Sequence, residues 1–136
     1  MPLSLEVAEK MLQAAKAKAV DMECSVSVAI VDSGGYVITV SRMDGAVPLT
    51  ANAAADMAYT AAMFRAPGDK ILPFASRPWF QSLVISTGGK LVPAEGEMPI
   101  EVGGSIVGGI GAAGGTTEQD VACCQAALTA LKNNFR

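Results

Sequence analysis

The chemistry open to this chain depends on its carboxylates, because the sequence of 136 residues contains no histidine. The missing imidazole excludes His-ligated haem, His-containing zinc sites and every Ser–His or Cys–His catalytic pair. Proton transfer therefore has to use Asp, Glu, Lys, Tyr, Cys, a bound ligand or water. Cys24, Cys123 and Cys124 have no metal-ligand spacing, so the sequence predicts no metal site.

Glu97 is the first candidate for acid–base chemistry. It lies in Gly96-Glu97-Met98-Pro99, at the mouth of an expected hairpin. A carboxylate beside glycine and methionine can lose its water, and desolvation raises its pKa toward the range of a general base. The other interpretation is a solvated loop glutamate. The sequence leaves both open.

Arg42 and Asp44 form a second candidate group, in Arg42-Met43-Asp44-Gly45 after an expected strand. Arg42 is placed to clamp a carboxylate with two hydrogen bonds, and Asp44 to act as a base. Alternatively, Asp44 starts a turn and Arg42 is a solvated edge residue.

Two helical regions supply further candidates. Asp56 and Tyr59 are three residues apart in an Ala-rich helix, so they share one face, with structural roles as the default. The first N–H groups of the final helix are placed to meet an anion beside Gly114, Gly115 and Thr116. The other interpretation is plain capping, since Glu118 and Asp120 compete for the same helix dipole.

Residues 109–114 match the pattern G-x-G-x-x-G, but a dinucleotide site is excluded. Only 22 residues follow Gly114, too few for a βαβ unit, and Asn134 stands where an acidic residue is required. We expect instead a strand kept thin so that another backbone can approach it closely.

Composition narrows the class of protein. The chain is 51% hydrophobic and 17% charged, and its net charge of −3 with scattered Lys and Arg argues against nucleic-acid binding. Its apolar runs fall short of the roughly 18 residues of a membrane span, and the acidic N-terminus is unlike a signal peptide. Three cysteines make no disulfide framework. We expect one domain over residues 1–136, in the reducing cytoplasm.

Periodicity predicts an α+β domain with an antiparallel sheet. The expected order begins with a helix from the cap Ser4 to near Asp21, strands at 25–31 and 36–41, and a helix from Thr50 to Pro67-Gly68. An irregular segment over 65–98 follows. The chain then forms strands at 99–102 and 105–110 and a helix over 117–134, which starts with a capping box of Thr117 and Asp120.

Four stretches make the chain resemble the GlcG/HbpS-like family, which includes the C-terminal domain of PduO-type proteins. They are residues 27–35, 42–46, 58–61 and 107–120, in family order over nearly the whole chain. The resemblance implies a profilin-like domain with α/β/α layers that forms homo-oligomers, and haem or corrinoid binding in some members. Without His, axial ligation of haem would fall to Met43, Tyr59, Cys24 or Thr116.

The chain also departs from the family pattern. Asp56-Met57 stands where the family commonly has Lys, and Glu97 stands where it tends to Gly. We expect no cofactor on the residues alone, and the resemblance is the sole pointer to a tetrapyrrole.

Three hypotheses follow. The first is a homo-oligomeric protein that binds a small molecule between Arg42–Asp44, Tyr59, the Glu97 segment and residues 114–118. The second is a cofactor-independent isomerase, lyase or hydrolase at that pocket, with Glu97 or Asp44 as general base and Arg42 holding a substrate carboxylate. The third is a structural oligomer with a vestigial pocket.

Overall fold

The computed structural model describes residues 3–134. In chain order its elements are α1 (Leu5–Asp21), β1 (Ser27–Asp32), β2 (Val37–Arg42), α2 (Leu49–Phe64), α3 (Gly68–Ile71), the short 3-10 helix η1 (Leu72–Phe74), α4 (Pro78–Ser86), β3 (Glu97–Val102), β4 (Ser105–Ala113) and α5 (Thr117–Asn134). The four strands form one antiparallel sheet in the order β2-β1-β4-β3. The predicted α+β class and both predicted hairpins are confirmed.

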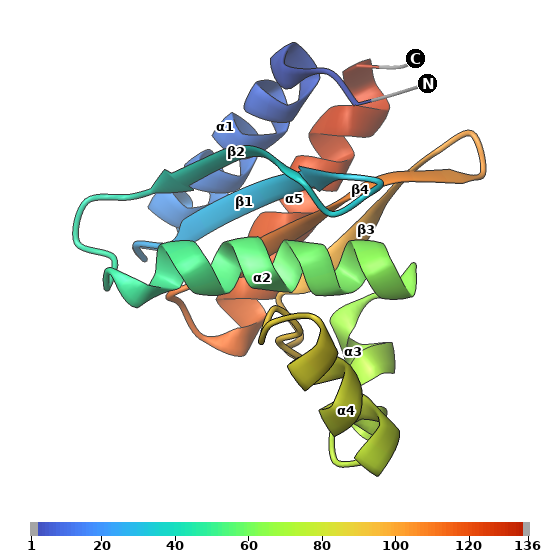
Figure 1. Ribbon diagram of the computed structural model, residues 1–136. Coiled ribbons are helices and arrows are strands. Elements are labelled where there is room, and N and C mark those ends of the chain that lie inside the picture. The colour runs from blue at the N-terminus through green and yellow to red at the C-terminus, as the bar shows by residue number, and fades with distance from the viewer. Residues whose placement is uncertain (1–2, 135–136) are drawn as a thin grey trace.

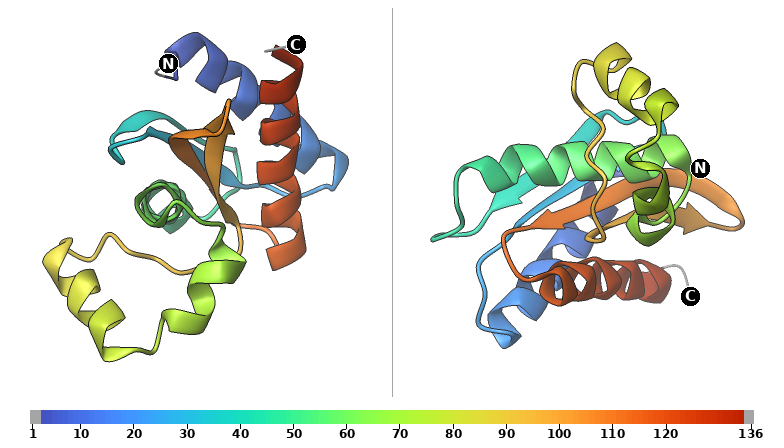
Figure 2. Two further views of the ribbon diagram at one scale, coloured as in Figure 1. Left: turned by 90° about the vertical axis from the view of Figure 1, so that its right-hand side faces the viewer. Right: turned by 90° about the horizontal axis from the view of Figure 1, so that it is seen from below.

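The helices cover both faces of the sheet. Figure 2 shows α1 and α5 side by side on one face and α2 on the other, the α/β/α layering that the resemblance implied. The larger core lies between the sheet and the α1–α5 pair, and it includes Met11, Val28, Ile110, Cys124 and Leu131. A smaller core lies under α2 and consists mostly of alanines.

The face of β4 under α2 carries glycine rather than side chains. A Cβ atom on Gly109 would meet the carbonyl oxygen of Ala58, and one on Gly111 would meet that of Ala54. The backbone of α2 therefore lies directly against the strand. The expected thin strand with a close backbone approach is confirmed, and β4 also extends to Ala113 because Ser27–Ala29 of β1 pair with its last residues.

The cap of α5 differs from its prediction by one residue. Thr116 and Gln119 form the reciprocal box: Thr116 N–H donates to Gln119 Oε1 at 2.9 Å, and Gln119 N–H donates to Thr116 Oγ1 at 3.2 Å. Asp120 instead accepts a hydrogen bond from the Gly115 N–H at 2.9 Å. The predicted Ser4 cap of α1 is confirmed by the hydrogen bond from Val7 N–H.

The segment over 65–98 is not irregular, as the sequence suggested. It contains α3, η1 and α4, because Pro67 and Pro78 stand at the beginnings of helices, where the missing N–H and fixed φ are tolerated. Residues 68–91, which we call the arm, project from the body beyond α2 (Figure 1). Ile71, Phe80 and Leu91 make a small core that attaches the arm to α2.

The close contact of α2 with β4 can be tested with Gly111→Ala. The added methyl group would force α2 away from the sheet, and we expect a loss of about 3 kcal/mol in the free energy of unfolding. Gly104→Ala is the control, because its φ of +82° strains alanine but nothing lies within 4 Å. It should cost about 1 kcal/mol in urea unfolding followed by circular dichroism. Equal losses would contradict the close contact.

Candidate functional site

A small apolar cavity lies between α2 and the arm. Its volume is about 260 Å³, and it is lined by Tyr59, Met63, Phe64, Leu83, Thr87 and Leu91. The stacked rings of Phe64 and Phe80, with centroids 5.6 Å apart, brace its inner wall. Met63 and Leu83 are 37% and 40% exposed, so the cavity opens to solvent. Its walls suit the apolar body of a small ligand.

Two charged side chains lie near Tyr59, which lines this cavity. The Lys90 ammonium lies 5.6 Å from the centroid of the Tyr59 ring, a cation–π geometry. Burial raises the pKa of Asp56, and Lys90 opposes that rise. Gly35, with a φ of +85°, lies so close to Tyr59 that a side chain there would overlap the ring. Lys90 is the cation placed to meet an anionic group on a ligand.

Thr60 holds the arm's return segment in place, a role that sequence reasoning missed. Its side chain is fully buried; its hydroxyl donates to the Asp56 carbonyl oxygen at 2.7 Å and accepts from the Val92 N–H at 2.8 Å. The bond from Val92, with a longer one of 3.4 Å from the Thr60 hydroxyl to the Lys90 carbonyl, ties residues 90–92 to α2 and so positions Lys90 and Leu91. A threonine within an alanine-rich helix was the available signal.

Glu97 is the first residue of β3 and is fully buried. Among residues 3–134, neither of its carboxyl oxygens has a hydrogen-bond partner. Its side chain lies under the base of the arm, because a Cβ atom on Gly68 would meet both the Ala94 carbonyl and Glu97 Cγ. Of the two interpretations from sequence, the desolvated carboxylate is confirmed and the solvated loop residue is wrong.

Burial raises the pKa of Glu97 to about 9, and the Ala94 backbone N–H, which is nearby without making a full hydrogen bond, offsets only part of that rise. The group is therefore protonated at neutral pH. Burial also raises the pKa of Cys123 to about 11, and that of Cys124, whose thiol donates to the Gly96 carbonyl. These two thiols are core groups rather than thiolate nucleophiles.

Arg42, Met43 and Asp44 lie beside α1, away from the cavity between α2 and the arm. Together with Lys16 and Gln13 of α1 and their neighbours, they line an open groove of about 570 Å³. Arg42 Nη1 donates to the Ala46 carbonyl at 3.0 Å, and Met43 Sδ accepts from the Val26 N–H at 3.5 Å. Both side chains thus help to hold the turn that follows β2.

The junction before α5 is also occupied by its own side chains. Gly114, with a φ of +122°, passes so close to Ser25 and Val26 that a side chain would collide with their backbone. The N–H groups of Gly115 and Thr116 are bonded to Asp120 and Gln119. Glu118 is exposed in the first turn of the helix. This junction supports capping rather than anion binding.

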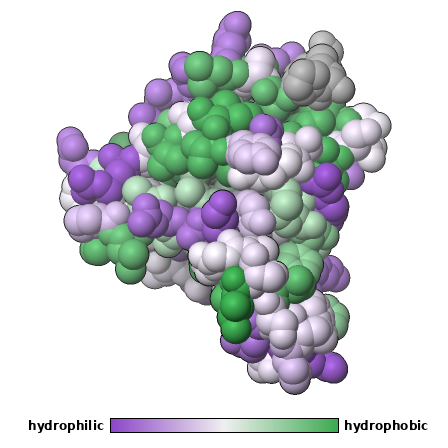
Figure 3. All heavy atoms as spheres, in the orientation of Figure 1, coloured by the Kyte–Doolittle hydropathy of each residue, from purple (hydrophilic) through white to green (hydrophobic). Residues whose placement is uncertain are grey.

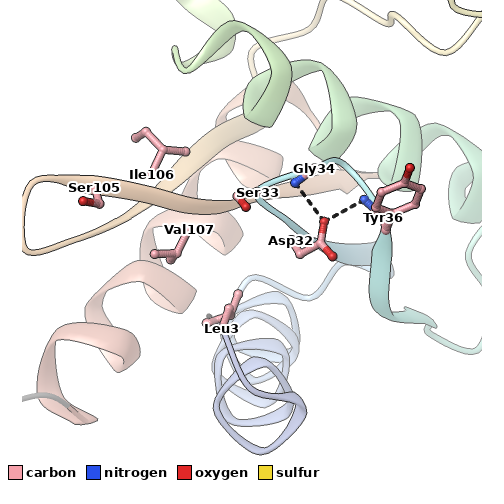
Figure 4. Close-up of a pocket in the computed structure, with 8 residues that line it drawn as sticks. All are labelled: Leu3, Asp32, Ser33, Gly34, Tyr36, Ser105, Ile106 and Val107. Carbon is pink, nitrogen blue, oxygen red and sulfur yellow. Dashed lines mark hydrogen bonds between the residues drawn. The ribbon is translucent and has the colours of Figure 1, made fainter. Parts of the chain in front are cut away.

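Another hollow, of about 500 Å³, lies at the turn between β1 and β2 (Figure 4). Asp32 points into the turn, where its Oδ1 accepts from the N–H groups of Gly34 and Tyr36 at 2.9 and 3.0 Å. Ser105, Ile106 and Val107 of β4 form the facing wall. The carboxylate is engaged in holding the turn, as expected for an aspartate at this position.

The predicted site residues do not form one pocket within a chain. Arg42 of β2 pairs with Ser27 of β1, whereas Glu97 of β3 pairs with Gly111 of β4. They lie on the two edge strands, three strand spacings or about 14 Å apart. Tyr59 and Asp56 lie near the arm, on the α2 face. Among residues 3–134, no three His, Cys, Asp or Glu side chains are grouped to hold a metal ion.

Comparison with known proteins assigns the chain to a family. A family model described as "Haem degrading protein HbpS-like" matches residues 3–129. The chain belongs to the HbpS-like family.

Two curated relatives and one solved structure illustrate the match. An uncharacterized 15.0 kDa protein of Citrobacter freundii, from a dhaT-dhaS intergenic region, is 32% identical over 93% of this chain and 89% of its own length. Protein GlcG of Escherichia coli K12 is 33% identical over 80% of this chain and 79% of its own length. The crystal structure of a PduOC:heme complex superposes with a TM-score of 0.86 at 27% identity, over 96% of this chain and 95% of that one.

For this HbpS-like chain, these matches confirm the family resemblance that the sequence indicated. The structure shows what surrounds the two residues that depart from the family pattern: Asp56 lies near Lys90, and Glu97 lies buried below the arm. In the part of the chain that the structure describes, no helix is both long and apolar enough to cross a bilayer.

The protonated state of Glu97 predicts a pH dependence of stability. Its native pKa of about 9 lies above the ordinary value of 4.5, so the unfolded chain binds fewer protons between these values. The free energy of unfolding should therefore fall as pH rises from 5 to 9, by up to about 5 kcal/mol. Glu97→Gln should remove most of this fall in urea titrations at pH 5, 7 and 9.

Glu101→Gln, on the exposed side of the same strand, is the matched control and should keep the wild-type slope. The slope is compared rather than the absolute stability, since a buried amide carries a desolvation cost of its own. A Glu97→Gln slope equal to that of wild type would contradict the buried, protonated carboxyl.

Proposed function

We propose that this HbpS-like protein is a homo-oligomeric binder of small amphipathic anions, with the ligand's apolar body in the cavity between α2 and the arm. One observation carries the proposal: Tyr59 lines the apolar cavity of about 260 Å³, and the Lys90 ammonium lies over the Tyr59 ring. An aromatic carboxylate would place its ring among Met63, Leu83 and Leu91 and its charge beside Lys90.

Haem does not fit the residues that this chain offers. Met43 Sδ accepts a backbone hydrogen bond, and the Thr116 hydroxyl belongs to the α5 cap. Burial raises the pKa of Cys24, which disfavours a thiolate ligand. Tyr59 lines a cavity smaller than the roughly 300 Å³ lower bound for drug-sized ligands. We therefore derive no chemistry through haem, although a PduOC relative has been crystallised with it.

The geometry favours binding over acid–base catalysis. A general base must lie within hydrogen-bond reach of its substrate. Glu97 is 0% exposed, and it lies on the opposite edge strand from the arginine meant to hold the substrate carboxylate. Asp44 does lie near Arg42 in the open groove, but that groove has no apolar enclosure to exclude water.

Calorimetric titration with naphthalene-2-carboxylate tests the proposal. We expect one site per chain with a Kd of about 1 mM or tighter, and Lys90→Met should weaken binding five- to tenfold by removing the cation that meets the carboxylate. Lys132→Met, which removes an exposed lysine of α5 away from the arm, is the matched control and should bind as wild type does.

A neutral analogue sharpens the test. Naphthalene-2-methanol should bind wild type and Lys90→Met alike, because it lacks the charge that Lys90 recognises. A Lys90→Met affinity for the carboxylate equal to that of the Lys132→Met control would contradict this function. Haemin should give no shifted Soret band and no pigment retained on gel filtration; retained pigment would also contradict it.

A further inference from the structure

The arm exposes more apolar surface than its own small core explains. α4 carries no charged residue and buries only Phe80. Helical spacing places Trp79 and Leu83 on one flank of its outer face and Ile85 on the other, with Ser82 and Ser86 between them. Ile85 is 81% exposed, and Trp79 is 46% exposed. A helix that is apolar on several sides requires a partner for the faces that its own chain leaves open.

The apolar side chains of the arm leave a sizeable area uncovered. The exposed large apolar side chains of the arm and its neighbour on α2 are Met63, Leu72, Phe74, Trp79, Leu83 and Ile85. Large apolar side chains present roughly 150–250 Å² each when free, so about 500 Å² of apolar surface stays uncovered. A stable dimer buries about 800 Å² per partner, of which about 65% is apolar in homodimers. The arm therefore supplies about the apolar area that one dimer contact needs.

We propose that the arm joins two copies of this chain through α4, so that the second copy covers the mouth of the cavity between α2 and the arm. Met63 and Leu83 both line the cavity and form part of the exposed surface, so one contact serves assembly and enclosure. The proposal rests on the proposed binding function and names the surface that completes its site.

Charge favours a second copy as the occupant. Exposed Asp69, Lys70 and Arg77 give the arm both signs, so a two-fold contact can set Asp69 of one copy against Lys70 or Arg77 of the other. An anionic membrane surface fits less well, since the chain carries a net charge of −3. In the space-filling view the arm, at the lower end, shows green and pale residues with only small purple groups (Figure 3).

The edge strands of the sheet, β2 and β3, are the alternative surfaces for pairing between two copies. β3 is protected against edge pairing by Pro99 and by the exposed Glu101. β2 lacks such protection along Val37–Ser41, and Val40 is 38% exposed. A variant on β2 therefore provides the alternative against which the arm is tested.

Light scattering coupled to gel filtration of the full chain, loaded at about 10 and 100 µM, tests the proposal. Wild type should contain two or more copies. Ile85→Asp should give a smaller assembly, or dissociate at a concentration at least tenfold higher, because the charge enters the contact. Ile85 is so exposed that this change should leave the fold intact by circular dichroism.

Two controls introduce a charge at exposed apolar residues elsewhere, Val20→Asp with the same sign and Val40→Lys with the opposite sign. Val20→Asp lies on an exposed position of α1, and Val40→Lys lies on the β2 edge; both should keep the wild-type assembly. The proposal is overturned if wild type is a monomer at 100 µM, if Ile85→Asp assembles as wild type does, or if Val40→Lys dissociates in its place.

The ligand readout separates this proposal from the function. Ile85→Asp should bind naphthalene-2-carboxylate at least threefold more weakly than Val20→Asp does, because its cavity mouth stays open. An unchanged affinity in a dissociated Ile85→Asp overturns the closure. If Lys90→Met still weakens binding, the small-molecule site stands without it.

Discussion

The direct contact between the α2 backbone and the glycines of β4 is the constraint on which the rest of the structure depends. Gly109 and Gly111 bring the carbonyls of Ala54 and Ala58 against the strand, which fixes both the height and the rotation of α2. That helix then presents Thr60 inward and Tyr59 toward the arm. A bulkier strand would move the floor of the cavity and the anchor of the arm together.

The arm turns this scaffold into a binding surface. The Thr60 hydroxyl holds its return segment, the stacked Phe64 and Phe80 rings brace its inner side, and Lys90 is left over the Tyr59 ring. Glu97 lies buried under the base of the arm, and within the described chain its carboxyl oxygens have no hydrogen-bond partner. Because burial raises its pKa, the group is protonated at neutral pH. The same segment that encloses the cavity thus determines the ionisation of the buried acid.

Local patterns predicted most of the fold. The Ser4 cap, the short gap between the strands predicted at 99–102 and 105–110, and the apolar spacing of α5 each act within a few residues, and the structure follows them. The helices of the arm were missed because Pro67 and Pro78, which suggested breaks, stand where helices start. The sequence left open whether Glu97 is buried, since its burial depends on Gly68, 29 positions earlier in the chain, lying over it.

The predicted site shows the same limit. Residue types and local context select Arg42 and Glu97, but sheet order places them on opposite edges, and no spacing along the chain reveals that. A crystal structure of the protein with naphthalene-2-carboxylate locates the binding site most directly. The ring should lie between Tyr59 and Leu91, with the carboxylate within hydrogen-bond distance of Lys90 Nζ. A ligand in the groove of Arg42 and Asp44, with the cavity beside the arm empty, would contradict the proposed function.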